Sequence, residues 1–125
     1  MENCHIPVSI GELYDKYSIL EIKLNKINDT VKIEHIKKEM SYLKPYIDKY
    51  NLDNLVRLEI YQINEKLWNI EDKIREKEGD NKFDDEFISL ARSVYITNDK
   101  RSKIKNKINI LLNSNIIDIK SYTKY

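Results

Sequence analysis

Apolar residues recur every three or four positions through most of this 125-residue chain, and this spacing constrains the fold more than any other feature. Side chains with such spacing share one face of an α-helix. The repeats fall into four segments, over residues 10–27, 33–47, 56–74 and 83–112. Only two glycines and two prolines are available for turns, a composition that favours long helices over a β-sandwich. The sequence therefore predicts an all-α fold, an antiparallel bundle of about four helices.

Several residues mark the expected helix ends. Ser9 followed by Glu12 has the spacing of a capping box at the start of the first helix. Pro45 is expected to end or kink the second helix, and Gly79 to lie just beyond the end of the third. The length favours one domain over residues 1–125, with an N-terminal arm over 1–8 and a C-terminal tail over 114–125.

The fourth apolar segment is interrupted in its middle. Its stripe stops near residue 94 and resumes near residue 108, and Asn98, Arg101 and Lys105 occupy the inward positions between. One interpretation is a helix break near Asn98, because Asn98 or Asp99 can cap a new helix. The other is a continuous helix that carries two cations on its inward face.

Helical wheels place possible partners for these cations on two other helices. Glu21 lies at the edge of the apolar stripe of the first helix, and Trp68 and Glu71 lie on a second, polar face of the third. We therefore expect Arg101 and Lys105 to meet Glu21 and Glu71. Such a polar layer would fix the register of the bundle, because removing one partner of a buried ion pair costs about 3 to 5 kcal/mol.

A charged cleft is the leading functional hypothesis. A guanidinium group donates two parallel hydrogen bonds to a phosphate, and an aromatic ring stacks on a flat ligand. The predicted function is a small intracellular domain that binds an anionic small molecule, such as a nucleotide or a sugar phosphate, without a cofactor or an assigned catalytic residue. The predicted ligand-binding residues are Glu21, Trp68, Glu71, Arg92, Tyr95, Asn98, Arg101 and Lys105.

A structural or protein-interaction module is the alternative. The faces that carry Tyr61 and Trp68 on the third helix, and Ile19 and Ile22 on the first, would then contact a helical protein partner or a second copy of the chain.

A third hypothesis is a metal-dependent nucleotide phosphohydrolase. Glu12 and Asp15 have the i, i+3 spacing of a carboxylate pair that holds Mg²⁺. The third helix supplies no second pair with this spacing, so a solvated helix start is the favoured explanation for Glu12 and Asp15.

Other partners are not expected. The net charge is +1, and aromatic residues do not interleave along the basic stretch 92–107, which argues against nucleic acid. Cys4 is the single cysteine and cannot form an internal disulfide. A long apolar segment and a signal peptide are both missing, so we expect no membrane association and a cytoplasmic location, or the host cytoplasm or virion if the protein is viral.

Four strings resemble a known family: SIGELYDKYSILEIK at 9–23, LWNIEDKIREKE at 67–78, LARSVYITNDKRSKIKNKIN at 90–109 and IKSY at 119–122. They are similar to a family of short proteins with an uncharacterised helical domain, found in bacteria and in phages or large DNA viruses. The resemblance implies a shared set of polar residues rather than a known activity. Bacterial members are sometimes associated with genes for surface polysaccharides, which implies a connection to sugars or nucleotide sugars.

Overall fold

A computed structural model describes all 125 residues and contains helices but no strands. It confirms the predicted all-α fold. None of the helices combines the length and the hydropathy that crossing a membrane requires. The four helices are α1 (Ile10–Lys26), α2 (Thr30–Lys49), α3 (Asn54–Gly79) and α4 (Asp85–Leu111).

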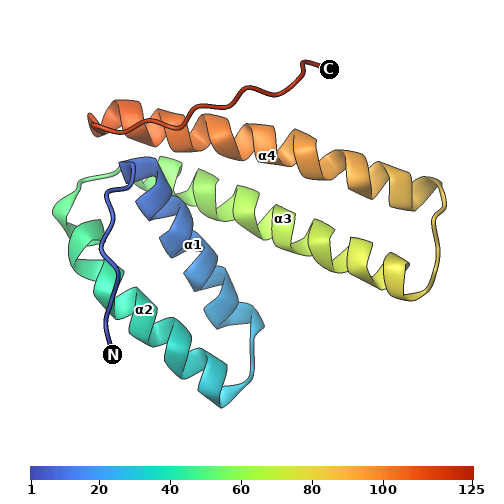
Figure 1. Ribbon diagram of the computed structural model, residues 1–125, viewed down its shortest axis with the longest axis horizontal. Coiled ribbons are helices and arrows are strands. Elements are labelled where there is room, and N and C mark those ends of the chain that lie inside the picture. The colour runs from blue at the N-terminus through green and yellow to red at the C-terminus, as the bar shows by residue number, and fades with distance from the viewer.

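The helices form two hairpins that lie across one another (Figure 1). The α1–α2 hairpin covers the region where the first half of α3 runs beside the second half of α4, and the other halves of α3 and α4 extend beyond it. α1 packs against all three other helices, whereas α2 packs closely against α1 alone. α1 is therefore the central element, and its side chains have neighbours on three sides.

Polar side chains cap the helix N-termini. The Ser9 hydroxyl accepts a hydrogen bond from the Glu12 amide at 3.0 Å, as the capping box predicts. The Glu12 carboxylate does not complete the box, because it contacts Lys105 instead. The other three helices each have an aspartate cap whose side chain accepts from a first-turn amide: Asp29, Asp53 and Asp84.

Two helix ends differ from the sequence prediction. α2 does not end at Pro45 but continues to Lys49, since a proline near a helix end removes one amide donor and leaves the other bonds intact. Gly79 is the last residue of α3 rather than the residue beyond it. The left-handed conformation after this helix belongs to Asn81, with φ of 53°, because asparagine tolerates that region.

α4 is continuous, so the predicted break near Asn98 is wrong. Thr97 beside it is buried, with 1% of its surface exposed. Packing against the other helices therefore outweighs the weak helix propensity of this stretch.

An apolar core fills the end of the molecule where the hairpins cross. Ile60 and Ile108 are fully buried there, and the Tyr14 hydroxyl donates a hydrogen bond to the Ile47 carbonyl at 3.1 Å. From α4 only Ile108 is fully buried in this core, and Ile104 packs against it while partly buried. The core residues are Leu13, Tyr14, Tyr17, Ile47, Leu52, Val56, Ile60 and Ile108.

The far end of the α3–α4 hairpin has a much thinner core. Lys77 closes the turn by pairing with Asp84 at 2.8 Å and Glu86 at 3.1 Å. Phe83 and Ile88 are exposed. The apolar stripe that the sequence places near residues 83–94 is thus only partly covered within the chain.

Candidate functional site

The backbones of α1 and α4 approach closely where they cross. A side-chain carbon on Gly11 would overlap the carbonyl oxygen of Lys105, so only glycine fits this position. The Gly11 amide donates to the Asn109 side-chain oxygen at 2.6 Å. This contact sets how far the two helices can slide past each other.

A buried ion pair lies beside this crossing. Asp15 is fully buried on α1, and both of its carboxylate oxygens accept hydrogen bonds from Arg101 on α4, from Nε at 2.8 Å and from Nη2. The pKa of Arg101 is raised, mainly by these hydrogen bonds to Asp15. The Asn64 amide of α3 donates to Asp15 at 2.9 Å and to Ser18 at 2.8 Å. Three helices thus meet at Asp15.

A second ion pair continues this polar layer toward the C-terminal tail. Lys105 lies 2.6 Å from the Glu12 carboxylate and 3.9 Å from that of Asp118. The Asp118 carboxylate also accepts from the Ser9 hydroxyl and from the Asn109 amide, each at 3.3 Å. We call this set the junction cluster: Glu12, Asp15, Asn64, Arg101, Lys105 and Asp118.

The partners predicted for the two cations are therefore wrong. Glu21 and Glu71 form no ion pair with Arg101 or Lys105. Arg101 pairs with Asp15 instead, and Lys105 pairs with Glu12. Glu71 is exposed on α3 and lies 3.6 Å from Arg75. The solvated helix start predicted for Asp15 is also wrong, because α3 and α4 pack against α1 and bury this carboxylate.

Glu21 lies apart from the junction cluster. Burial raises the pKa of its carboxyl, and the positive charges of Arg57 and Lys44 oppose this shift only in part. Glu21 thus remains a half-buried acid rather than a member of the predicted ion pair.

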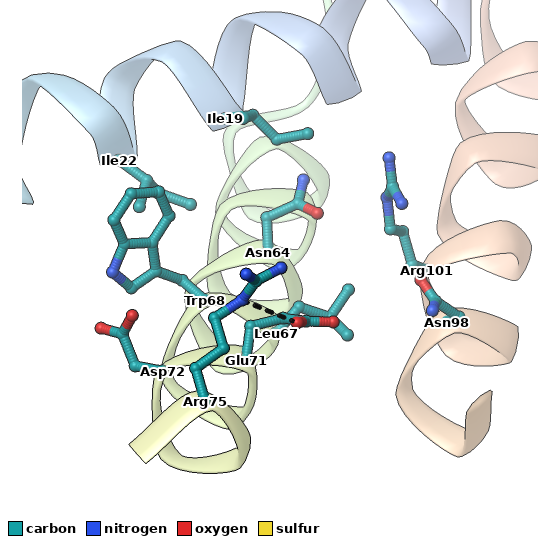
Figure 2. A pocket seen from close by; sticks show the side chains of 10 residues that line it. All are labelled: Ile19, Ile22, Asn64, Leu67, Trp68, Glu71, Asp72, Arg75, Asn98 and Arg101. Carbon is teal, nitrogen blue, oxygen red and sulfur yellow. Dashed lines mark ion pairs between the residues drawn. The ribbon is translucent and has the colours of Figure 1, made fainter. Parts of the chain in front are cut away.

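A pocket of about 460 Å³ opens beside the junction cluster, between α1, α3 and α4. In Figure 2, Trp68 and Ile22 appear on one side of the pocket, and Asn98 and Arg101 appear on the other side, on α4. Arg75 reaches across the front of the pocket toward Glu71 (Figure 2). We call it the Trp68 pocket; its lining is Ile19, Ile22, Asn64, Leu67, Trp68, Glu71, Asp72, Arg75, Asn98 and Arg101.

The pocket gathers four of the eight predicted ligand-binding residues, namely Trp68, Glu71, Asn98 and Arg101. The other four lie elsewhere. Lys105 belongs to the junction cluster and Glu21 does not line the pocket; Arg92 is exposed on α4 outside it, and Tyr95 lines a separate hollow beside the C-terminal tail.

Sequence reasoning missed Asn64 and Arg75. For Asn64 a signal was present: it follows Ile60 by four positions and precedes Leu67 by three, so it continues an apolar stripe with a polar side chain. An amide at such a position needs a buried partner, and here it has Asp15. Arg75 follows Trp68 by seven positions, a spacing that places both on one face of the helix, although it is not among the predicted ligand-binding residues.

The carboxylate pair proposed for Mg²⁺ has other contacts. Glu12 binds Lys105 and Asp15 binds Arg101. No group of three or more histidine, cysteine, aspartate or glutamate side chains is placed to share a metal ion. Cys4 is exposed in the N-terminal arm.

Comparison with known proteins gives one match. No curated protein and no solved structure matches the chain. The model of one family, described as a family of unknown function (DUF6165), matches residues 4–125. This range contains all four helices, the junction cluster and the Trp68 pocket. The chain therefore belongs to the DUF6165 family.

Proposed function

We propose that the Trp68 pocket binds a small phosphorylated molecule, such as a nucleotide or a sugar phosphate. The position of Arg101 is the observation that carries this proposal. Its Nε and Nη2 donate to buried Asp15, its side chain is 28% exposed, and its Nη1 donates to no protein acceptor. A guanidinium that is already held in place loses little further freedom on binding an anion.

The opposite wall of the pocket supports a ligand with a flat or apolar face. The apolar part of the lining consists of Trp68, Ile19, Ile22 and Leu67. Small-molecule pockets commonly combine such a wall with a few polar groups, within about 300 to 1,000 Å³. The Trp68 pocket has a volume of about 460 Å³ and combines four hydrophobic residues with six polar or charged ones, so it is more polar than most such sites.

The charges around the pocket narrow the class of ligand. Two arginines, Arg75 and Arg101, are balanced by Glu71 and Asp72 in the lining, and Asp15 lies behind Arg101. This balance disfavours a ligand with several phosphates, since each added charge would meet a carboxylate. Carboxylates do accept hydrogen bonds from hydroxyl groups. The pocket thus suits a ligand that carries a single phosphate and several hydroxyl groups.

Ligand-induced shifts of the melting temperature test the proposal. The panel contains sugar monophosphates, nucleoside mono-, di- and triphosphates, and inorganic phosphate. We expect the monophosphates of sugars or nucleosides to give the largest shifts. Trp68→Leu should abolish the shift, and Arg101→Lys should weaken binding about tenfold, because lysine keeps the charge but lacks the fork.

A matched pair of variants controls for general charge effects. Arg75→Met removes a cation from the pocket, and Lys73→Met removes one from an exposed position of α3 outside the lining. Only Arg75→Met should weaken binding. The absence of a shift with every ligand up to millimolar concentration would remove the proposal and leave the polar residues a structural role. A dimer that sedimentation detects and that Trp68→Leu dissociates would instead assign this face to an interface.

A further inference from the structure

The C-terminal tail, residues 114–125, returns along α4 without regular secondary structure (Figure 1). Two sets of hydrogen bonds hold it there. The Asn106 amide donates to the Asp118 carbonyl at 3.2 Å, and its oxygen accepts from the Asp118 amide at 3.3 Å. Near the end of the chain the Tyr125 hydroxyl donates to Asp99 at 2.6 Å. The tail is thus an anchored part of the α4 surface.

The tail brings aromatic rings to the basic stretch of α4. Tyr122 and Tyr125 are more than three-quarters exposed, and the ring of Tyr125 packs edge-on against that of Tyr95, with centroids 5.1 Å apart. We propose that this surface binds single-stranded nucleic acid. We call it the tail surface and define it by Tyr95, Lys100, Lys103, Lys120, Tyr122, Lys124 and Tyr125.

The fold sorts the cations of α4 into two groups. Arg101 and Lys105 point inward and are neutralised in the junction cluster, and Lys107 pairs with Glu59. Lys100 and Lys103 are exposed and have no carboxylate within ion-pairing distance. The tail adds two more exposed lysines without an ion pair: Lys120 and Lys124.

Two carboxylates, Asp99 and Asp118, adjoin these four lysines and offset their charge only in part, and Asp118 also lies 3.9 Å from Lys105. Asp99 accepts from Tyr125, and Asp118 accepts from Ser9 and Asn109. Four ammonium groups without an ion pair lie around three tyrosine rings, and that of Lys120 lies 5.6 Å from the centre of the Tyr122 ring. A phosphate backbone binds to such ammonium groups by releasing its counterions.

The shape of the tail surface favours unpaired bases. A hollow of about 1060 Å³ holds the three tyrosines, and a second of about 580 Å³ holds Lys100 and Lys103. The two hollows share Asp99, Lys120 and Tyr125, so rings and lysines adjoin along one path. Stacking on aromatic rings needs exposed base faces, which a single strand offers and a duplex does not.

From the sequence, nucleic acid is not an expected partner because aromatic residues do not interleave along the basic stretch of α4, which contains a single aromatic residue, Tyr95. The rings come instead from residues 122 and 125, and only the path of the tail brings them beside Tyr95. The sequence therefore does not reveal that these rings lie beside the basic stretch of α4, whereas the folded structure does.

Fluorescence anisotropy with a labelled dT oligonucleotide of twelve nucleotides, in 50 mM salt, tests the proposal. The single strand should bind more tightly than a duplex of the same length. Tyr122→Ala should weaken binding at least about fivefold through lost stacking, while Tyr122→Phe should retain it. The double variant Lys120→Gln, Lys124→Gln should reduce the slope of log affinity against log salt by about 1.4.

Matched variants on α2 separate the tail surface from general charge and aromatic effects. Tyr42→Ala removes an exposed ring, and Lys37→Gln with Lys38→Gln removes two exposed charges; these variants should bind as the original protein does. Trp68→Leu should also retain binding, which distinguishes this surface from the Trp68 pocket.

Three results would overturn the proposal. The first is no binding of the single strand in 50 mM salt. The second is equal binding by the original protein and Tyr122→Ala. The third is Tyr122-dependent binding to vesicles that contain phosphatidylserine without binding to the oligonucleotide, which would assign the surface to a membrane.

Discussion

The two sides of α1 are packed by different chemistry. Toward α2 and the start of α3 lies the apolar core, in which Tyr17 and Ile60 are buried. Toward α4 lies the junction cluster, in which Asp15 meets Arg101. Apolar burial stabilises in proportion to area and has little direction, at about 25 cal/mol per Å². An ion pair with fixed hydrogen bonds is satisfied in one alignment only.

This difference suggests a division of roles. The apolar core provides the free energy of folding, and the junction cluster determines which residues of α1 and α4 face each other. A buried ion pair adds little net stability compared with a well-packed apolar pair, but its disruption is costly. Substitutions on the two sides of α1 should therefore differ in whether their losses in the free energy of unfolding add.

Removal of the Asp15 charge should have the largest effect. Asp15→Asn leaves the partly buried guanidinium of Arg101 without its counter-charge, so we expect a loss of about 3 kcal/mol in the free energy of unfolding. Urea denaturation measures this loss. Lys44→Gln breaks an exposed ion pair with Asp48 at 2.7 Å and should cost less than about 0.5 kcal/mol.

The double variant Asp15→Leu, Arg101→Met sharpens this test. With both charges removed, most of the stability lost in Asp15→Leu should return, which corresponds to a strong coupling between the two sites. If the losses in the free energy of unfolding of the two single variants simply add, Asp15 and Arg101 do not act as a unit. The proposed difference between the two sides of α1 is then wrong.

The close crossing of α1 and α4 predicts an intermediate effect. Gly11→Ala introduces a carbon that overlaps the Lys105 carbonyl oxygen, so the helices must separate, at a cost of about 2 kcal/mol. Gly79→Ala is the matched control, because nothing lies within 4 Å of the added carbon. That change should stabilise the protein slightly. A Gly11→Ala protein as stable as the original would contradict a register set by backbone contact.

Glu21, at the edge of the apolar side, should give the smallest effect. Burial raises the pKa of its carboxyl above the value in the unfolded chain, so the folded state favours the protonated form. The stability from this group is complete below the unfolded pKa and is lost as the pH rises through the folded pKa. Glu21→Gln should therefore raise the melting temperature slightly at pH 7.

The same comparison at pH 3.5 provides the check on Glu21. Glu21 is then largely protonated in the folded state, so Glu21→Gln and the original protein should melt together. Glu71→Gln removes the same charge from an exposed position and should have little effect at pH 7. An unchanged difference between Glu21→Gln and the original at both pH values would exclude titration of Glu21 as the cause.

The periodicity of the sequence predicts the four helices and their buried faces, and capping chemistry correctly places the start of α1 at Ser9. It does not predict partners between helices. A helical wheel gives the direction of a side chain around its own axis, but not which neighbour covers that direction. Asp15, predicted at a solvated helix start, is buried because the hairpins lie across each other and place α1 against three helices.

The candidate site, like the fold, can be predicted only in part from the sequence. The inward direction of Arg101 and the setting of Trp68 among charged residues are predictable from spacing, and both residues line the pocket. The role of Asp118 is not predictable, because residues 114–125 have no period. Their path depends on individual polar contacts, such as those between Asp118 and Asn106.

The hydrogen bond between Ser9 and Asp118 joins residues 109 positions apart. On the ribosome α1 is made before α3 and α4, so Asp15 is hydrated until Asn64 and Arg101, its partners on those helices, have been synthesised. Contacts between distant parts of a chain form late and slowly, and a partly made chain exposes surface that the finished one covers. The contacts of the α1–α2 hairpin in the junction cluster can therefore be completed only after α4 and Asp118 have left the ribosome.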